Sequence, residues 1–183
     1  EYYFNDINDF GEIVGSQPMV RPAVLIRQGE RIDLTGACHA ASINNFGHIA
    51  GSAWDAAGRC SHLLFYADSV AQDLGQFAGA STTWGTAINS DDTIVGYAES
   101  ASGVRAFRYA AAQGYTDLGS LGGSHTWAFD ISGAGQIVGS STLPGQGAYD
   151  PTRAILFSEG RLVDLNDYVD DAGTGGVADR HSR

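Results

Sequence analysis

Short apolar runs separated by turn residues recur along the chain, and no window shows a helical period of useful length. One pattern, Ile-Asn-x-x-Gly-x-Ile-Val-Gly, occurs four times, with small departures in three of the copies. The copies span residues 7–15, 43–51, 88–96 and 131–139. Asn and Gly tolerate positive φ, so each copy predicts a tight turn between two strands.

Two further landmarks follow each copy in the same order. The first is an aromatic-aliphatic run such as Leu63-Leu64-Phe65-Tyr66, and the second is an Asp-Leu pair such as Asp73-Leu74. The leading isoleucines are 36, 45 and 43 residues apart. Four short strands in a period of about 45 residues are typical of a propeller blade.

The sequence therefore predicts an all-β fold, a β-propeller built from four four-stranded blades. The blades span residues 1–36, 37–80, 81–123 and 124–168. Propellers have about four to eight blades, so the four units close alone or form part of a larger ring, which two copies could share as a homo-oligomer. Residues 169–183 are rich in Asp and Gly and are expected to form a flexible or truncated tail.

Residues 117–124, with the sequence Asp-Leu-Gly-Ser-Leu-Gly-Gly-Ser, are followed by Ala128, Ile131 and the segment 135–139. This combination resembles the repeat of the HAF-repeat proteins, a bacterial group described as extracellular repeat proteins. The namesake motif is degraded in every copy, as in Arg105-Ala106-Phe107. The resemblance covers residues 1 to 168. It implies a propeller-like fold and an extracellular or cell-surface location, and it carries over no catalytic residues.

Composition narrows the classes of partner. The net charge is −11 and every fixed cation is an arginine, so a nucleic-acid surface is excluded. No apolar run reaches the roughly 20 residues that span a bilayer. The chain opens on Glu1-Tyr2-Tyr3, which already reads as strand, so it is expected to be a processed or excised piece of a longer product.

Cys38 and Cys60 are either two buried thiols or one disulfide, and their spacing does not suit a metal site. The resemblance to secreted proteins favours the bridge. The two residues begin the first and third strands of their unit, which places them roughly 10 Å apart across two strand spacings. A bridge therefore requires the loops to bend inward. No cofactor is expected. Asp91-Asp92 and Asp170-Asp171 could hold a calcium ion at a surface turn, but neither pair has the ligand density of a recognised calcium loop.

Aromatic rings stand four positions before the leading isoleucine of every unit, namely Tyr3, His39, Trp84 and Trp127. Alternation in a strand predicts that each ring shares a face with its isoleucine. Such rings could circle one mouth of a central channel and bind sugars or other flat-faced ligands. The alternative is that they pack between blades. Trp54, expected in a loop of the second unit, is a further binding candidate. It has no counterpart in the other units, so the alternative is that it packs against its own loop.

The other polar residues do not form a recognisable catalytic or metal-binding pattern. His39, His62 and His125 lie in different strands without a paired acid at a telling spacing. One aspartate closes each unit and is expected to accept turn amide hydrogen bonds: Asp33, Asp73, Asp117 and Asp164.

The function expected from these observations is that of a non-enzymatic extracellular repeat protein, a binding or assembly module, with carbohydrate as a candidate ligand. The alternative is a secreted hydrolase with its site at the propeller channel. That alternative requires polar residues from several units to converge at one mouth.

Overall fold

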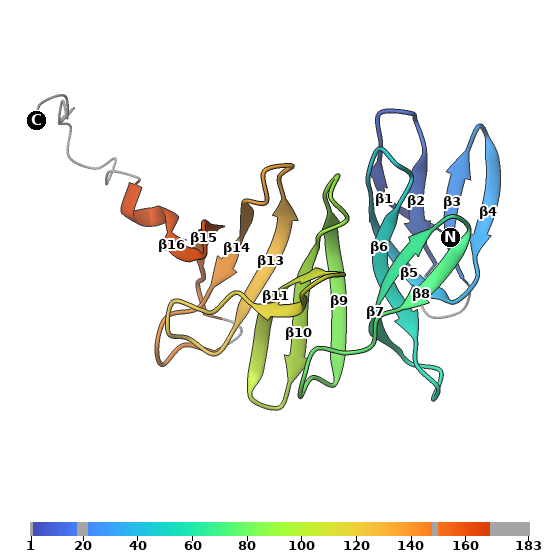
Figure 1. Cartoon of the computed structure of the whole chain (residues 1–183). Coiled ribbons are helices and arrows are strands. Elements are labelled where there is room, and N and C mark those ends of the chain that lie inside the picture. Colours follow the sequence, from blue (N-terminus) through green and yellow to red (C-terminus); the bar gives the residue numbers. More distant parts are fainter. Residues whose placement is uncertain (1, 18–21, 148–149, 169–183) are drawn as a thin grey trace, which may run out of the picture.

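The computed structural model describes residues 2–17, 22–147 and 150–168. Over these residues the chain forms four four-stranded antiparallel sheets, which confirms the all-β prediction (Figure 1). Sheet 1 comprises β1 (Tyr3–Ile7), β2 (Ile13–Ser16), β3 (Ala23–Arg27) and β4 (Glu30–Leu34). Sheet 2 comprises β5 (Ala37–Ile43), β6 (Ile49–Trp54), β7 (Cys60–Ala67) and β8 (Val70–Asp73).

Sheet 3 comprises β9 (Thr82–Ile88), β10 (Ile94–Ser100), β11 (Gly103–Ala110) and β12 (Gly114–Asp117). Sheet 4 comprises β13 (Thr126–Ile131), β14 (Ile137–Ser141), β15 (Arg153–Ser158) and β16 (Arg161–Asp164), and a short 3-10 helix, η1 (Leu165–Tyr168), follows it. In each sheet the strands pair in chain order, so every sheet is a meander that lies within one repeat unit. The expected tail, 169–183, lies outside the described residues. No helix in the described part of the chain is long and apolar enough to cross a membrane.

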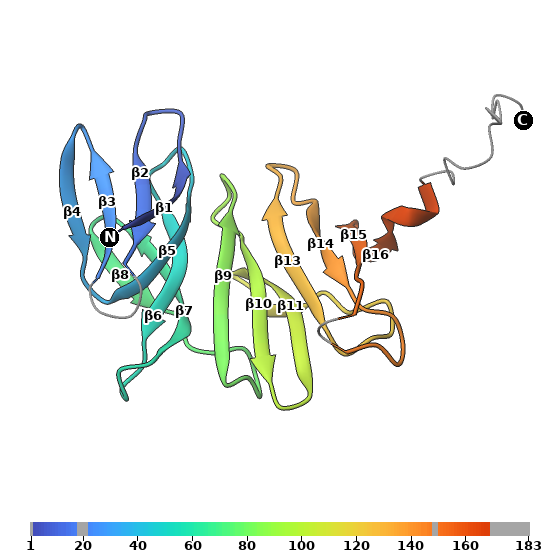
Figure 2. The same ribbon diagram turned by 180° about the vertical axis from the view of Figure 1, so that it is seen from behind.

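The sheets pack face to face in chain order, each against the next (Figures 1 and 2). Three apolar clusters hold them together, and each cluster joins two consecutive sheets. Val14 of β2 packs with Ile43 of β5, and Val95 of β10 packs with Ile131 of β13. A middle residue of the second strand thus faces the following sheet, whereas the leading isoleucine faces the preceding one.

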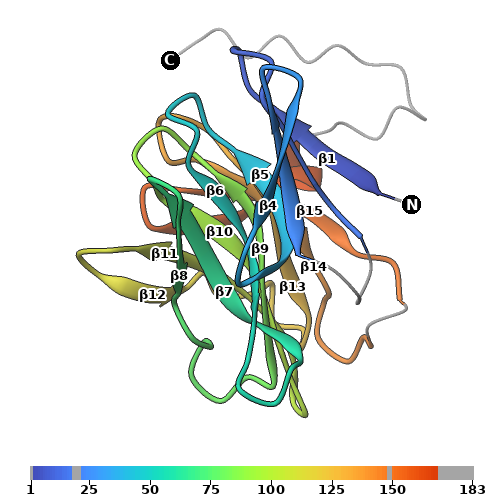
Figure 3. The same cartoon turned by 90° about the vertical axis from the view of Figure 1, so that its right-hand side faces the viewer.

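The row is open at both ends, so the described sheets do not form the closed four-blade ring considered above. Sheet 1 exposes Phe4 and Ile7, which are 57% and 60% accessible. We call this surface the leading face. Sheet 4 exposes Phe129 and Val138, which are 53% and 42% accessible, and we call this surface the trailing face. Figure 3 views the row along its length.

A β-bulge interrupts the first strand of every sheet and corrects the prediction based on simple alternation. In β1, Phe4 pairs with Gly15 and Asp6 with Val14, so Asn5 is the extra residue. The equivalent extra residues of the other sheets are Ala41, Thr86 and Phe129. Because the bulge shifts the alternation by one residue, each aromatic ring lies on the strand face opposite its isoleucine rather than on the same face.

The bulge also explains the last glycine of the repeat pattern. A Cβ atom on Gly96 would lie 1.9 Å from the carbonyl oxygen of Trp84, and one on Gly139 would lie 1.9 Å from that of Trp127. Only glycine lets the second strand approach the bulged first strand this closely.

The asparagine of the pattern connects one sheet to the next. Its Oδ1 accepts the backbone N–H groups of its own turn, as Asn44 does from Phe46 and His48. Its Nδ2 donates to the following sheet: Asn8 to the carbonyl of Asn44, Asn44 to that of Asn89, and Asn89 to that of Ser132. Sequence reasoning assigned only the turn role, because the second contact depends on how the sheets stack.

Candidate ligand-binding cavity

A cavity of about 300 Å³ lies where the strand ends of sheets 1, 2 and 3 meet. Three of the four aligned aromatic rings line it, contributed by Tyr3 of β1, His39 of β5 and Trp84 of β9. Trp54, the last residue of β6 rather than a loop residue, adds a fourth ring. The remaining lining residues are Asn5, Ser16, Cys38 and Cys60.

A disulfide joins Cys38 and Cys60 at the cavity wall and ties the start of β5 to the start of β7. The two Cα atoms are 5.8 Å apart, not the roughly 10 Å expected from two regular strand spacings. Bulges account for the difference: Ala37 pairs with Ala53 and His39 with Ser52, which leaves Cys38 as an extra residue. A second irregularity between Ala53 and Trp54 brings β7 closer.

His39 contacts one of the other aromatic rings of the cavity. Its imidazole meets Trp84 edge to face, with the ring centroids 6.0 Å apart. Burial lowers the pKa of His39 because the charged form loses its hydration, so the ring is neutral at pH 7. Among the described residues, none supplies a hydrogen-bond partner to the buried Nδ1. A buried polar atom in this state is suited to a ligand or to an ordered water.

The two other polar side chains of the lining already serve the fold. Asn5 Nδ2 donates to the Ala40 carbonyl at 2.7 Å, and Ser16 Oγ accepts from the Ala40 amide at 3.0 Å. Both contacts join sheet 1 to sheet 2 and hold the cavity walls at a fixed separation. The sequence did not point to Asn5 or Ser16 as site residues. The only signal is their position: Asn5 lies on the same strand as Tyr3, and Ser16 pairs with Tyr3 across the sheet.

Trp127, the fourth aligned ring, does not line this cavity. It lies in sheet 4, where it stacks on His125 with ring centroids 5.8 Å apart. His125 Nδ1 in turn contacts Ser124 Oγ at 2.8 Å. The ring position is therefore shared by all four units, but only the first three units bring it to one place.

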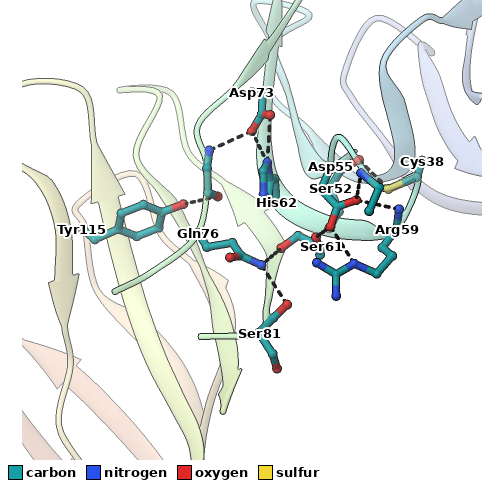
Figure 4. A network of polar contacts seen from close by, with 12 residues as sticks. Cys38, Ser52, Asp55, Arg59, Ser61, His62, Asp73, Gln76, Ser81 and Tyr115 are labelled. Atoms are coloured by element: carbon teal, nitrogen blue, oxygen red, sulfur yellow. Dashed lines mark hydrogen bonds and ion pairs between the residues drawn. The ribbon is translucent and has the colours of Figure 1, made fainter. Parts of the chain in front are cut away.

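The polar network beside the cavity lacks the connections of a catalytic triad (Figure 4). Ser61 Oγ donates to Asp55 at 2.9 Å, whereas the neighbouring His62 pairs with Asp73 at 2.9 Å. Ser61 and His62 thus serve different acids and do not contact each other through these groups. Asp55 also accepts the backbone N–H and the guanidinium of Arg59, and the backbone contact leads in holding its pKa at about 2.

The aspartates that close the units act largely as expected. Asp73, Asp117 and Asp164 each accept the backbone N–H two residues later, which confirms their turn role. Asp33 departs from the prediction: its carboxylate binds the Arg31 side chain, and the Thr35 amide donates to its backbone oxygen instead.

No group of three or more His, Cys, Asp or Glu side chains suited to a metal ion occurs among the described residues. Of the two acidic pairs considered for calcium, Asp170-Asp171 lies outside those residues. Asp92 is engaged with protein donors, since it contacts Asn44 Nδ2 at 2.9 Å and His48 Nδ1 at 2.8 Å.

Comparison with known proteins finds one kind of similarity, at the level of fold. No family model matches the chain, and no curated protein matches it. Among solved structures, TolB from Acinetobacter baumannii is similar, with a TM-score of 0.62 at 14% sequence identity. The match covers 90% of this chain and 43% of the TolB chain, so this chain spans less than half the length of that protein.

Proposed function

We propose that the chain is an extracellular binding module of the propeller type, related to the HAF-repeat proteins, whose aromatic cavity binds a carbohydrate. The observation that carries the proposal is the convergence of Tyr3, His39, Trp54 and Trp84 on one cavity. These rings come from three sheets, so the site depends on the repeat array and on no single unit.

The chemistry of the lining supports a carbohydrate. Sugar rings present apolar C–H faces that stack on aromatic side chains, and indole rings offer such area at low entropic cost. The unpartnered Nδ1 of His39 adds a polar group among these rings. The volume of about 300 Å³ is at the small end of the range for small-molecule sites, which favours a short saccharide or chain end over a long polymer.

The disulfide supports an extracellular setting. Disulfides persist in oxidising compartments, and the bridge between Cys38 and Cys60 is part of the cavity wall. The likeness to TolB, a protein that contains a propeller, and the meander topology of all four sheets support a propeller-type assembly. The eight residues that line the cavity include no carboxylate, so a binding role fits them better than the hydrolase alternative.

The proposal is tested by glycan-array screening of the oxidised protein, followed by calorimetric titration with the best ligand. Trp84→Ala is expected to weaken binding about tenfold or more, because a buried aromatic anchor contributes roughly 1.4 kcal/mol or more to such a contact. Trp54→Ala is expected to act in the same direction.

Trp127→Ala is the matched control, since it removes the same residue type at the equivalent repeat position but outside the cavity. It should leave the dissociation constant within about twofold of wild type. Equal weakening of glycan binding by Trp84→Ala and Trp127→Ala, or no glycan bound above background, would contradict the proposal. Circular dichroism confirms that each variant is folded.

A further inference from the structure

The leading and trailing faces are two unmatched halves of the junction that the chain makes three times internally. At the residue equivalent to Ile7, the other sheets bury Ile43, Ile88 and Ile131 to 7% accessibility or less. At the residue equivalent to Val138, they bury Val14, Ala50 and Val95 completely. At these two repeat positions, exposure is thus confined to the two faces that have no neighbouring sheet.

The two faces are opposite in kind. Every internal junction joins a trailing face to a leading face and never joins two faces of one kind. One copy of the chain therefore offers one of each. A second copy could cover them only by a head-to-tail contact if the internal rule is kept, and such a contact is heterologous.

The two faces also depart from the repeat at positions that meet across internal junctions. At an internal junction, the extra residue of the bulge in one sheet contacts a residue of the next sheet. That second residue lies three positions before the leading isoleucine. Asn5 donates to the Ala40 carbonyl, and Thr86 donates to the Ala128 carbonyl. On the trailing face, the extra residue of the bulge is Phe129. On the leading face, the residue three positions before the leading isoleucine is Phe4.

Both positions of this pair are therefore phenylalanine at the open ends, where internal junctions have a small or polar residue. At the position of Phe4, the internal residues Ala40 and Ala128 are 0% and 1% accessible, so a ring there would not fit at the internal spacing. Together, two such rings can replace the hydrogen bond with an aromatic contact at a wider spacing. Exposed apolar side chains gathered on one face of a sheet mark an interaction surface, so both faces call for a cover.

We propose that two copies of this chain associate head to tail, with Phe129 and Val138 of one copy packed against Phe4 and Ile7 of the other. The contact is apolar and lacks the asparagine connection of the internal junctions, because the fourth unit has Ser132 at that position. Each copy carries a net charge of −11, so the association strengthens as added salt screens the repulsion between copies.

Sedimentation velocity on two single-face variants tests the proposal. Phe4→Glu blocks the leading face only, and Phe129→Glu blocks the trailing face only. The wild-type chain, 19.2 kDa as a monomer, is expected to sediment at twice that mass or more at high concentration. Each variant alone is expected to remain a monomer, because it retains one face and no complement.

The decisive sample is the equimolar mixture of the two variants. Phe4→Glu retains a trailing face and Phe129→Glu retains a leading face, so the mixture should form a one-to-one heterodimer at twice the monomer mass. Ile7→Glu and Val138→Glu form a second pair that should behave identically, which keeps the test valid if one phenylalanine variant fails to fold.

Three results would overturn the proposal. A wild-type chain that stays monomeric at high concentration and high salt would assign the faces to another partner. Self-association of either variant alone would show that faces of one kind pair. A mixture that stays monomeric, with both variants folded by circular dichroism, would show that the two faces do not complement each other.

Discussion

His39 combines three properties at one position: a ring shared with the other units, a place in the cavity wall, and a titratable group that burial has made less basic. Because its pKa is lower in the folded chain than in the unfolded chain, the unfolded chain binds the proton more readily. The free energy of unfolding is therefore not reduced by His39 above the unfolded pKa of roughly 6.5. It falls as the pH drops from that value toward the folded pKa, because protons bind the unfolded chain first.

We expect acidification from about pH 7.5 to about pH 5 to lower the free energy of unfolding more in the wild type than in His39→Phe. Phenylalanine keeps an aromatic ring at the position, as the other units have, and removes the proton-binding group. Urea titrations at several pH values measure the difference. The remaining histidines are common to both proteins and cancel in the comparison, so parallel stability curves would rule out the His39 contribution.

At the scale of elements, the asparagine contacts are the repeated polar links between sheets. Asn44 makes two such contacts from its Nδ2, at 2.9 Å to the Asn89 carbonyl and at 2.9 Å to Asp92. Asn89 makes one, at 3.3 Å to the Ser132 carbonyl. Both residues are buried, so a lost donor removes one buried hydrogen bond from a carbonyl of the next sheet, which keeps only a backbone N–H of its own turn.

Replacement by serine copies the natural residue of the fourth unit, which keeps the turn acceptor and removes the link. We expect Asn44→Ser to lower the free energy of unfolding by about 1–3 kcal/mol, and Asn89→Ser to cost less because its single bond is longer. Chemical denaturation measures both, with Ser90→Ala at an exposed position of the Asn89 turn as control. The reverse order of the two variants would contradict this account of the links.

The elements themselves could be predicted from the sequence because hydrophobic alternation and turn residues are local signals. The four sheets follow the four repeats for that reason. The bulge could not be predicted: nothing in the residues around Asn5 or Thr86 marks an extra residue, and regular alternation was therefore the wrong guide to which face each ring occupies. The gathering of Tyr3, Trp84 and Trp54 likewise depends on sheet stacking, which is not a local property.

At the scale of the whole molecule, the core is divided into three clusters, each shared by two neighbouring sheets. Sheets 2 and 3 are covered on both faces, whereas sheets 1 and 4 are covered on one. Repeat arrays of this kind gain stability from nearest-neighbour contacts, so the end sheets open more readily than the middle ones.

Hydrogen exchange followed by mass spectrometry should therefore find the slowest amides in β6 and β10, the second strands of the two middle sheets. The amides of β1 and β14 should exchange faster, because Ile7 and Val138 beside them face solvent. The measurement is made at low protein concentration, so that association does not protect the ends. Uniform protection across the four sheets would show that the array unfolds as one unit.

The asparagine links give the array a direction, since each runs from a unit to its successor and the fourth unit ends the series with Ser132. This sets a rule for lengthening the protein by tandem duplication. A fifth unit joined after the fourth would need Ser132→Asn, whose Nδ2 would donate the link to that unit, and a small or polar residue in place of Phe129. Units inserted between existing ones would need neither change, so an engineered longer array grows most simply from its interior.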